Sequence, residues 1–291
     1  MENSKNSHYQ LALSFHRLLQ PEVYQGNNYL TTQMNQCIKE YYTNFLKHPK
    51  LIKFYEYNWA TRVMSIIPFI KEQTAGIRIL DAGCGVGTES LFFSSLNPNA
   101  EVIGVDIFSY CQAAQKRRLY WEQAVKKPLN VTFRREDIMD FVPEGLFDII
   151  WVEEAISHIY TPDLFIQKMH KYLKKGGLIF VSDTNLLNPY IYYRILKMRG
   201  FKKAEFIESK DEETGKTMKV FDENILTISG IEKTLKKHNF TILQRNTHGF
   251  IPRSIFSYSN SISRKLDIFL SKLPMINLFG GIYTVVARKI S

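Results

Sequence analysis

The stretch 77–88 constrains the fold of this chain more than any other, because an apolar run leads into three alternating glycines and then a helical pattern. Only Arg78 is polar between Ile77 and Leu80, which is typical of a buried strand. The glycines that follow can adopt positive φ, and they leave no Cβ between the backbone and a ligand. A helix beginning at Thr88 would direct its unpaired N–H groups into the same loop. The stretch therefore predicts a strand, a ligand-binding turn and a helix.

Asp81 ends this expected strand and stands before Gly83, Gly85 and Gly87. A loop built for pyrophosphate would avoid a carboxylate, whereas a ligand with an ammonium group would be attracted to one. The competing dinucleotide pattern is Gly-x-Gly-x-x-Gly, and its third glycine comes one position early here, with Thr88 in its place. The loop favours a ligand that carries an amino group over a dinucleotide.

Strand and helix patterns alternate along the rest of the chain, which predicts parallel strands joined by crossover helices. After the first strand we expect further strands at 102–105, 131–133, 147–152, 178–181, 240–243 and 283–287. Parallel strands of this kind bind ligands at their carboxyl ends. The functional residues are therefore expected where strands end.

Several helix ends can be predicted from capping residues. Thr161 is placed to cap a helix that begins at Pro162, and glycines 176–177 are expected to end it. Ser229 and Glu232 have the spacing of a capping box for a later helix.

The chain divides into a helical first part and an alternating second part. Residues 1–75 place aromatic and aliphatic side chains at helical spacing, so we expect an N-terminal helical cap there. Residues 76–291 form the expected ligand-binding domain. Within it, the segment from about 186 to 222 fits neither a strand nor a simple crossover, and its length predicts an inserted lid after the fifth strand.

The net charge of +10 is unevenly distributed. From Leu186 to the end there are 18 Lys and Arg against 9 Asp and Glu, a net of +9, so the first 185 residues carry +1. A solvated surface explains this asymmetry. A docking face for something acidic explains it as well, and a phosphorylated substrate, a carrier protein and a membrane surface are the alternatives.

The cysteines and the most apolar segments of the sequence indicate in which cellular compartment the protein is expected. Cys37, Cys84 and Cys111 are odd in number and widely spaced, which predicts neither a disulfide framework nor a zinc site and favours the cytoplasm. The polar N-terminus leads into no signal-peptide core, and the most apolar window, 268–287, is interrupted by a lysine, a proline and two glycines. We expect no membrane span.

Asp106 follows the expected second strand, 19 residues after Gly87. An acid about 20 residues beyond such a glycine loop is placed to accept hydrogen bonds from both hydroxyls of an adenosine ribose. A surface aspartate is the alternative, but an aspartate at the end of an apolar strand favours a binding role.

The Asp-x-Gly-x-Gly-x-Gly string at 81–87 resembles motif I of class I S-adenosylmethionine-dependent methyltransferases, and the later strands agree with that family in order and spacing. The resemblance implies an α/β fold, a Rossmann-like doubly wound sheet of seven mostly parallel strands with an antiparallel last strand. It implies S-adenosylmethionine as cofactor and methyl transfer to a small-molecule or lipid-linked acceptor, at oxygen.

The same resemblance implies which residues hold the cofactor. An acid after the third strand accepts from the adenine amino group while its neighbour packs on the ring, and Asp137 and Ile138 occupy these positions. The full predicted cofactor set is Asp81, Gly83, Cys84, Gly85, Gly87, Asp106, Ile107, Asp137, Ile138 and Glu153.

The segment 153–159 resembles the small-molecule methyltransferases that include the ubiquinone-biosynthesis O-methyltransferases. Some of those carry Glu-x-x-Glu-His, a set suited to magnesium; Glu154 and His158 match it, but Ser157 replaces the second glutamate. A neutral hydroxyl is a poor ligand for a hard cation, so we expect no metal.

His158 is the candidate catalytic residue, since an imidazole can take a proton near neutral pH. The alternatives are that His158 caps a helix or hydrogen-bonds within the core, and that in-line positioning alone supplies the acceleration.

Two other functions were weighed. A DNA adenine methyltransferase would carry an Asn/Asp-Pro-Pro-aromatic loop after the fourth strand; Asn188, Pro189 and Tyr190 follow the fifth, with one proline, so we expect no nucleic-acid partner. A Rossmann-like module that binds a ligand or a partner without turnover stays open.

The acceptor also stays open. An aromatic, polyketide, lipid or sugar-lipid molecule suits the tyrosines of the expected lid equally well, and the basic C-terminal third favours an anionic or carrier-bound acceptor, or peripheral membrane contact. The aromatic residues placed in this lid are Tyr190, Tyr192, Tyr193 and Phe201, and completion of the core is their alternative role.

Overall fold

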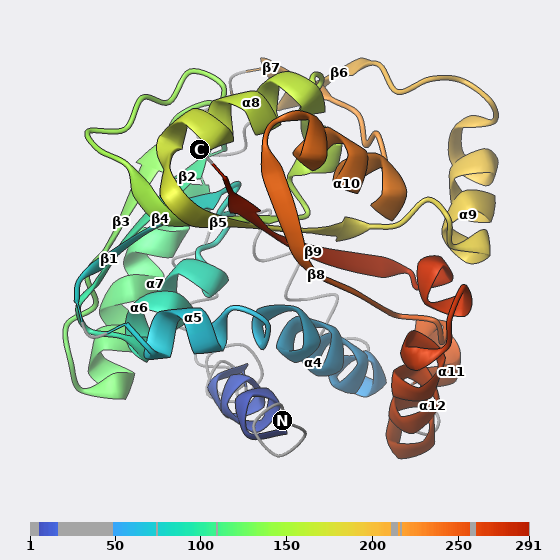
Figure 1. The fold of residues 1–291 in the computed structure, drawn as a ribbon, viewed down its shortest axis with the longest axis horizontal. Coiled ribbons are helices and arrows are strands. Elements are labelled where there is room, and N and C mark those ends of the chain that lie inside the picture. The colour runs from blue at the N-terminus through green and yellow to red at the C-terminus, as the bar shows by residue number, and fades with distance from the viewer. Residues whose placement is uncertain are drawn as a thin grey trace.

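The computed structural model describes residues 6–16, 49–73, 75–108, 110–210, 215, 217–256 and 260–290. Its centre is a seven-stranded sheet with helices on both faces (Figure 1). In spatial order the strands are β3 Val131–Arg135, β2 Ala100–Asp106, β1 Ile77–Ala82, β4 Phe147–Glu153, β5 Leu173–Thr184, β9 Ile282–Lys289 and β8 Phe240–His248.

The first five strands pair in parallel, and β9 runs antiparallel to both of its neighbours, β5 and β8. The predicted fold, a doubly wound and mostly parallel sheet with an antiparallel last strand, is confirmed. The chain reverses its direction of winding between β1 and β4, and ligands bind at the carboxyl ends of strands at such a point.

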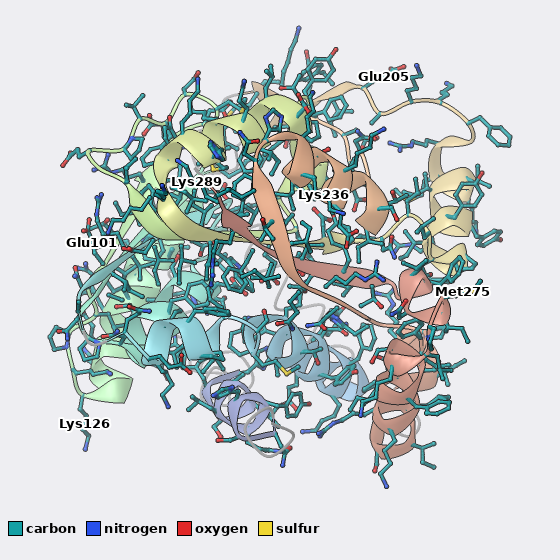
Figure 2. The ribbon with its side chains drawn as sticks, in the orientation of Figure 1. Glu101, Lys126, Glu205, Lys236, Met275 and Lys289 are labelled. Atoms are coloured by element: carbon teal, nitrogen blue, oxygen red, sulfur yellow. The ribbon has the colours of Figure 1, made fainter. Side chains whose placement is uncertain are left out.

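Alternate residues of the central strands pack into two different cores. Ile149 and Trp151 of β4 face a core shared with the N-terminal helices, while Ile150 and Val152 face the opposite one. The first core is covered by helix 6–16, α4 Pro49–Val63, α5 Ile67–Lys71, α6 Thr88–Leu96 and α7 Tyr110–Val125, and the second by α8 Pro162–Tyr172 and α10 Ile228–Lys237. Figure 2 shows how side chains fill both layers.

The described part of the predicted N-terminal cap is mostly helical, with turns at 64–66 and after Lys71. Trp59, Val63, Ile66 and Ile67, which belong to the aromatic and aliphatic side chains of this part, are buried in the core between the N-terminal helices and the sheet. Residues 1–5, 17–48 and 74 lie outside the described part of the chain.

The predicted helix ends differ from the observed ones in two places. Thr161 is the N-cap residue of α8 but its side chain makes no capping hydrogen bond, and α8 ends at Tyr172, ahead of the glycines at 176–177. Leu173 already pairs with Phe147 of β4, and the pairing register shifts directly after it, so the glycines lie in an irregular stretch of β5 instead.

The expected capping box of α10 is also displaced. Thr227, and not Ser229, is the N-cap residue, and its Oγ1 accepts a hydrogen bond from the Gly230 N–H at 3.0 Å. Ser229 lies inside the helix, because Ile228 already has to be helical to enter the core beneath α10.

The segment 186–222 does contain strands, contrary to the prediction. It forms α9 Pro189–Arg199 and then an antiparallel hairpin of β6 Phe206–Lys210 and β7 Thr217–Phe221. The pairing of Phe206 with Phe221 brings together residues that the sequence pattern left unpaired. Between β8 and β9 lie α11 Arg253–Phe256, α12 Asn260–Lys272 and the short helix η2 Ile276–Phe279. No described helix has both the length and the apolar character needed to cross a membrane.

Candidate functional site

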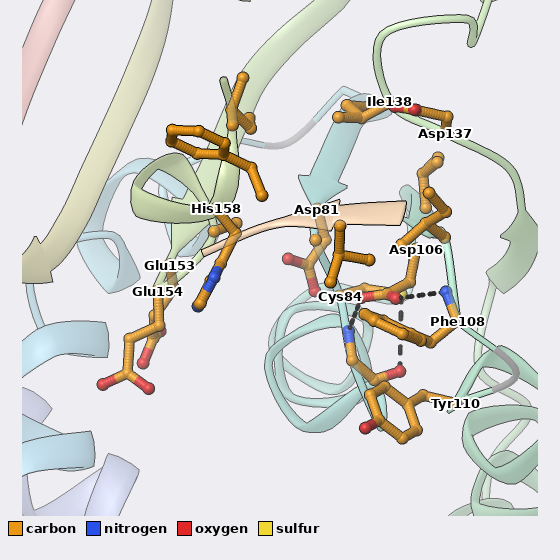
Figure 3. A pocket seen from close by; sticks show the side chains of 18 of the residues that line it. Asp81, Cys84, Asp106, Phe108, Tyr110, Asp137, Ile138, Glu153, Glu154 and His158 are labelled. Carbon is orange, nitrogen blue, oxygen red and sulfur yellow. Dashed lines mark hydrogen bonds between the residues drawn. The ribbon is translucent and has the colours of Figure 1, made fainter. Parts of the chain in front are cut away.

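A cavity of about 870 Å³ lies at the carboxyl ends of β1, β2 and β4. It is lined by nearly all of the residues predicted from the sequence, and Figure 3 shows several of them around it. The predicted residues at its wall are Asp81, Gly83, Cys84, Gly85, Asp106, Ile107, Asp137, Ile138, Glu153 and His158.

Gly87 is the one predicted cofactor residue that is not at the cavity wall. It is the N-cap of α6, with φ +76°, and a Cβ there would lie 2.6 Å from the Phe133 ring. Gly85, with φ +51°, has no atom within 4 Å of the place its Cβ would take. Gly87 is therefore required by packing, whereas Gly85 leaves the backbone open to a ligand.

Asp106 ties the end of β2 to the glycine loop. Its Oδ2 accepts a hydrogen bond from the Gly85 N–H at 2.8 Å, and its Oδ1 accepts one from the Phe108 N–H at 2.9 Å. Burial raises the pKa of this carboxyl, and the two backbone donors oppose the rise. Each carboxylate oxygen has a second lone pair, so Asp106 can also accept from ligand hydroxyls.

Asp81 is buried beneath the loop and accepts a hydrogen bond from the Ser90 hydroxyl at 2.5 Å. Burial, followed by the nearby Glu89 carboxylate, raises the pKa of Asp81 to about 8. Trp59 of α4 donates its Nε1–H to Glu89 at 2.6 Å. A cation in the cavity would favour the ionised form of this acidic pair.

Arg62 of α4 reaches the end of β4 from the N-terminal cap. Its Nε lies 2.8 Å from the Glu153 carboxylate and its Nη1 lies 2.6 Å from that of Glu154. Burial raises the pKa of Glu153 well above its usual range, and Arg62 opposes this rise. Glu154 has φ +47°, a conformation that costs energy outside glycine and is common at functional sites.

Four residues of the N-terminal part line the cavity although the sequence did not identify them as site residues. They are His16, Tyr55, Trp59 and Arg62. An arginine within an apolar helical stripe is the one signal that was available, since Arg62 stands between Trp59 and Val63.

His158 lies in η1 Ile156–His158, directly after β4, and its side chain is exposed at the cavity wall. The short helix is held from below, because the backbone N–H of Ser157 donates to the buried Asp183 carboxylate at 3.1 Å. Burial, and then the charge on Glu154, raises the pKa of Asp183 to about 7. His158 is thus presented to the cavity and is not buried in a core.

The β6–β7 hairpin adds aromatic side chains to the wall of the cavity. The rings of Phe206 and Phe221 pack on Tyr160 with centroid distances of 5.0 and 5.1 Å, and Lys219 lies beside them at the wall. Tyr193 and Phe201, predicted as lid residues, are exposed and not among the lining residues, and the same is true of Tyr190 and Tyr192. Neither the cavity role nor the core role expected for these four is observed.

The donor set can be tested against the groups that class I methyltransferases bind. Carboxylates at Asp81 and Asp106 suit an ammonium and two hydroxyls, and Ile107 and Ile138 offer an apolar surface to a flat ring. The residues present therefore fit an adenosyl ligand that bears an amino group. Among the described residues, no three His, Cys, Asp or Glu are grouped so as to hold a metal ion.

Comparisons with known proteins agree with this geometry. The profile of a methyltransferase domain family matches residues 73–247. A ubiquinone biosynthesis O-methyltransferase of Nitrobacter winogradskyi is 35% identical over 111 residues, which are 38% of this chain and 40% of that protein. An uncharacterized methyltransferase of Schizosaccharomyces pombe is 30% identical over 118 residues, 40% of this chain and 42% of that protein. The chain thus spans about two fifths of the curated relatives it matches.

A solved structure shares the fold. Phosphoethanolamine N-methyltransferase 2 of Haemonchus contortus, determined in complex with S-adenosyl-L-methionine, superimposes with a TM-score of 0.52 at 18% identity over 80% of this chain and 53% of that one. The sheet order, the glycine loop with its two aspartates and the family match over residues 73–247 lead to one assignment. This chain belongs to the methyltransferase domain family, the class I S-adenosylmethionine-dependent methyltransferases.

Proposed function

We propose that the protein transfers a methyl group from S-adenosylmethionine to a small-molecule or lipid-linked acceptor, at an oxygen atom. One observation carries this proposal: the glycine loop with Asp81 and Asp106, the side chain of His158 and the aromatic hairpin wall all line one cavity of about 870 Å³. The cofactor supplies a methyl group on a positively charged sulfur. The residues of this chain then have to bind, orient and shield the reacting groups.

In this proposal the cofactor is held at the carboxyl ends of β1 to β4. Asp106 accepts from the ribose hydroxyls, and Asp137 and Ile138, both at the wall, bind the adenine. Asp81 and Glu153 provide negative charge for the methionine ammonium, and Cys84 and Ile107 complete the surface.

His158 is proposed to accept the proton of the acceptor hydroxyl. Its side chain is exposed to the cavity and its backbone is fixed by the Ser157–Asp183 hydrogen bond. An acceptor placed between His158 and the glycine loop would have its oxygen directed at the cofactor.

The acceptor is proposed to lie under the β6–β7 hairpin. The rings of Phe206, Phe221 and Tyr160 suit a flat or lipidic acceptor, and Lys219 suits an anionic group on it. Oxygen as the methylated atom is supported by the O-methyltransferase names of partial relatives such as that of Nitrobacter winogradskyi.

We also propose that residues 1–75 act as a cap on a methyltransferase domain at 76–291, with the segment at about 186–222 as a lid. Trp59 and Arg62 at the cavity wall support the cap. The cytoplasm is the proposed compartment, and Cys84 and Cys111 are free thiols. A module that binds the cofactor without turnover is the alternative function.

The experiment incubates the purified protein with S-adenosylmethionine labelled in its methyl group and with separate aqueous and lipid extracts. A labelled product that forms with the native chain and not with the Asp106→Ala variant supports the proposal. Saturable cofactor binding without a labelled product in either extract contradicts it and favours the non-catalytic module.

A further inference from the structure

Helix α12 buries polar residues and exposes apolar ones. Ser263 and Asp267, one turn apart, are both buried. The Asp267 carboxylate accepts hydrogen bonds from the Tyr57 hydroxyl at 2.7 Å, the Gly249 N–H at 3.0 Å and the Phe250 N–H at 2.7 Å. Because these partners satisfy the hydrogen bonds of a buried carboxylate, they fix the orientation of α12 about its own axis.

In this orientation, α12 directs a stripe of apolar side chains toward solvent. Ile262, Leu266 and Phe269 follow each other at i, i+4 and i+7, so they share one side of the helix. Ile262 is 69% exposed and Phe269 is 57% exposed. Lys265 and Lys272 lie on the same outward side, beside this stripe.

Two neighbouring elements continue this exposed apolar surface. Helix η2 contacts α12 and follows Met275, which is 77% exposed. The first turn of α9 is joined to η2 because the Asn188 side-chain amide donates to the Phe279 carbonyl at 2.8 Å. Helix α9 buries none of its residues, and Phe201 beyond it is 91% exposed.

Figure 1 shows α9, α11 and α12 along one edge of the molecule. We call this the α9–α12 surface and define it by Tyr193, Met198, Phe201, Ile262, Phe269 and Met275. Large apolar side chains exposed on neighbouring elements along one edge point to an interaction site.

The charge on this surface is mostly positive, although one of its arginines, Arg199, lies 3.5 Å from the Asp222 carboxylate. Residues 186–204 contain five Lys and Arg and no acid; residues 253–281 contain four, and their single acid, Asp267, is buried. A second copy of the chain would therefore bring like charges together. The fitting occupant is anionic and also offers an apolar phase.

We propose that the α9–α12 surface docks the protein on a membrane that contains anionic lipids. The exposed apolar side chains enter the interface of the bilayer, and the interleaved Lys and Arg contact the anionic headgroups. Four residues connect the carboxyl end of β5 to α9, and β5 is the neighbour of β4, whose carboxyl end lines the cavity. The proposal does not depend on the identity of the acceptor.

The test is flotation of the full chain with vesicles of phosphatidylcholine alone and of an equimolar mixture with phosphatidylglycerol. We expect binding to the mixed vesicles that weakens as salt is added, and little binding to phosphatidylcholine. The paired change Lys197→Glu with Lys265→Glu should lower partitioning at least about 30-fold. Phe201→Ser with Phe269→Ser should lower it at low and at high salt, because the apolar contribution is not screened.

The matched control is Lys126→Glu with Lys175→Glu, the same change of charge at exposed lysines elsewhere. Figure 2 shows Lys126 on the side opposite Met275. The control pair should keep most of its binding to the mixed vesicles. All variants should keep their melting temperature and their affinity for S-adenosylhomocysteine.

Three results would overturn the proposal. The first is no binding to mixed vesicles, and the second is an equal loss with the control lysines. The third is dimerisation, or capture of an acidic protein partner, that the Phe201 and Phe269 changes abolish while vesicle binding is absent.

Discussion

The Arg62 guanidinium of α4 lies 2.8 Å from the Glu153 carboxylate at the carboxyl end of β4, and both side chains are largely buried. This ion pair joins the N-terminal helices to the floor of the cavity. It also connects cofactor binding to the cap, because Glu153 is at the cavity wall.

Arg62→Met is expected to destabilise the protein by about 3 kcal/mol, since it leaves a buried carboxylate without its counter-charge. The loss should be larger than for Arg78→Met, whose partner Glu101 is more exposed. Urea unfolding measures both. In Arg62→Met with Glu153→Gln, much of the lost stability should return; an unchanged stability of the single variant would refute the role of the pair.

Asp106→Ala should abolish tight binding of S-adenosylhomocysteine while leaving the protein folded. Two hydrogen bonds to ribose hydroxyls are lost, each worth about 1.5–3 kcal/mol, and Gly85 loses its carboxylate partner as well. Isothermal titration calorimetry measures the affinity, and Asp140→Ala on the nearby loop serves as control. Equal affinities of both variants would show that Asp106 does not hold the ribose.

Asp81 should make unfolding depend on pH in a definite direction. Its pKa is about 8 in the fold, raised by burial and by Glu89, against 3.8 as the ordinary value. Protonated Asp81 adds its full contribution to the free energy of unfolding below about pH 4. This contribution is lost as the pH rises to about 8, because between these values only the folded chain holds the proton. Asp81→Asn should remove this part of the pH dependence, as measured by urea unfolding across the window.

The same group predicts proton release when the cofactor binds. If Asp81 ionises against the methionine ammonium, titration of S-adenosylhomocysteine between about pH 5 and 7 should release a proton, and the measured enthalpy should vary with the buffer. In Asp81→Asn the buffer dependence should disappear. A wild-type enthalpy that is the same in every buffer would contradict this role.

His158→Ala should lower kcat by about 100-fold or more without changing cofactor affinity, as expected for the loss of a general base. His158→Gln distinguishes base from positioning residue, because glutamine keeps a polar side chain but takes up no proton. Full turnover in the alanine variant would show that in-line positioning suffices.

The hairpin, and not the exposed tyrosines, should control acceptor binding. Phe206→Ala and Lys219→Ala are each expected to lower kcat/KM for the acceptor about tenfold, since both side chains line the cavity. Tyr193→Ala is the control, as its side chain is exposed and not at the cavity wall; it should behave as wild type without vesicles present. The reverse result would assign acceptor binding to α9 and not to the hairpin.

Local sequence was sufficient for the alternation of strands and helices and for the meeting of three predicted residues at one cavity wall. Asp81, Gly85 and Asp106 follow apolar strands, and the ends of neighbouring parallel strands meet at one edge, so their meeting could be predicted from periodicity. Gly87 was predicted to bind the cofactor, but a Cβ at this position would lie 2.6 Å from the Phe133 ring, so packing explains the glycine.

Tertiary structure decided the rest of the site. Arg62 and Trp59 come from a helix whose sequence pattern shows which side is buried, but not which strand end lies beneath it. The Phe206–Phe221 pairing depends on a hairpin between two short, mostly exposed strands, where alternation is a weak signal. In α12 the buried Asp267 runs against the usual rule of burial, and only its three-dimensional partners set the outward face. Residues close in sequence reveal strand ends and turns, whereas contacts between distant segments depend on how those elements pack.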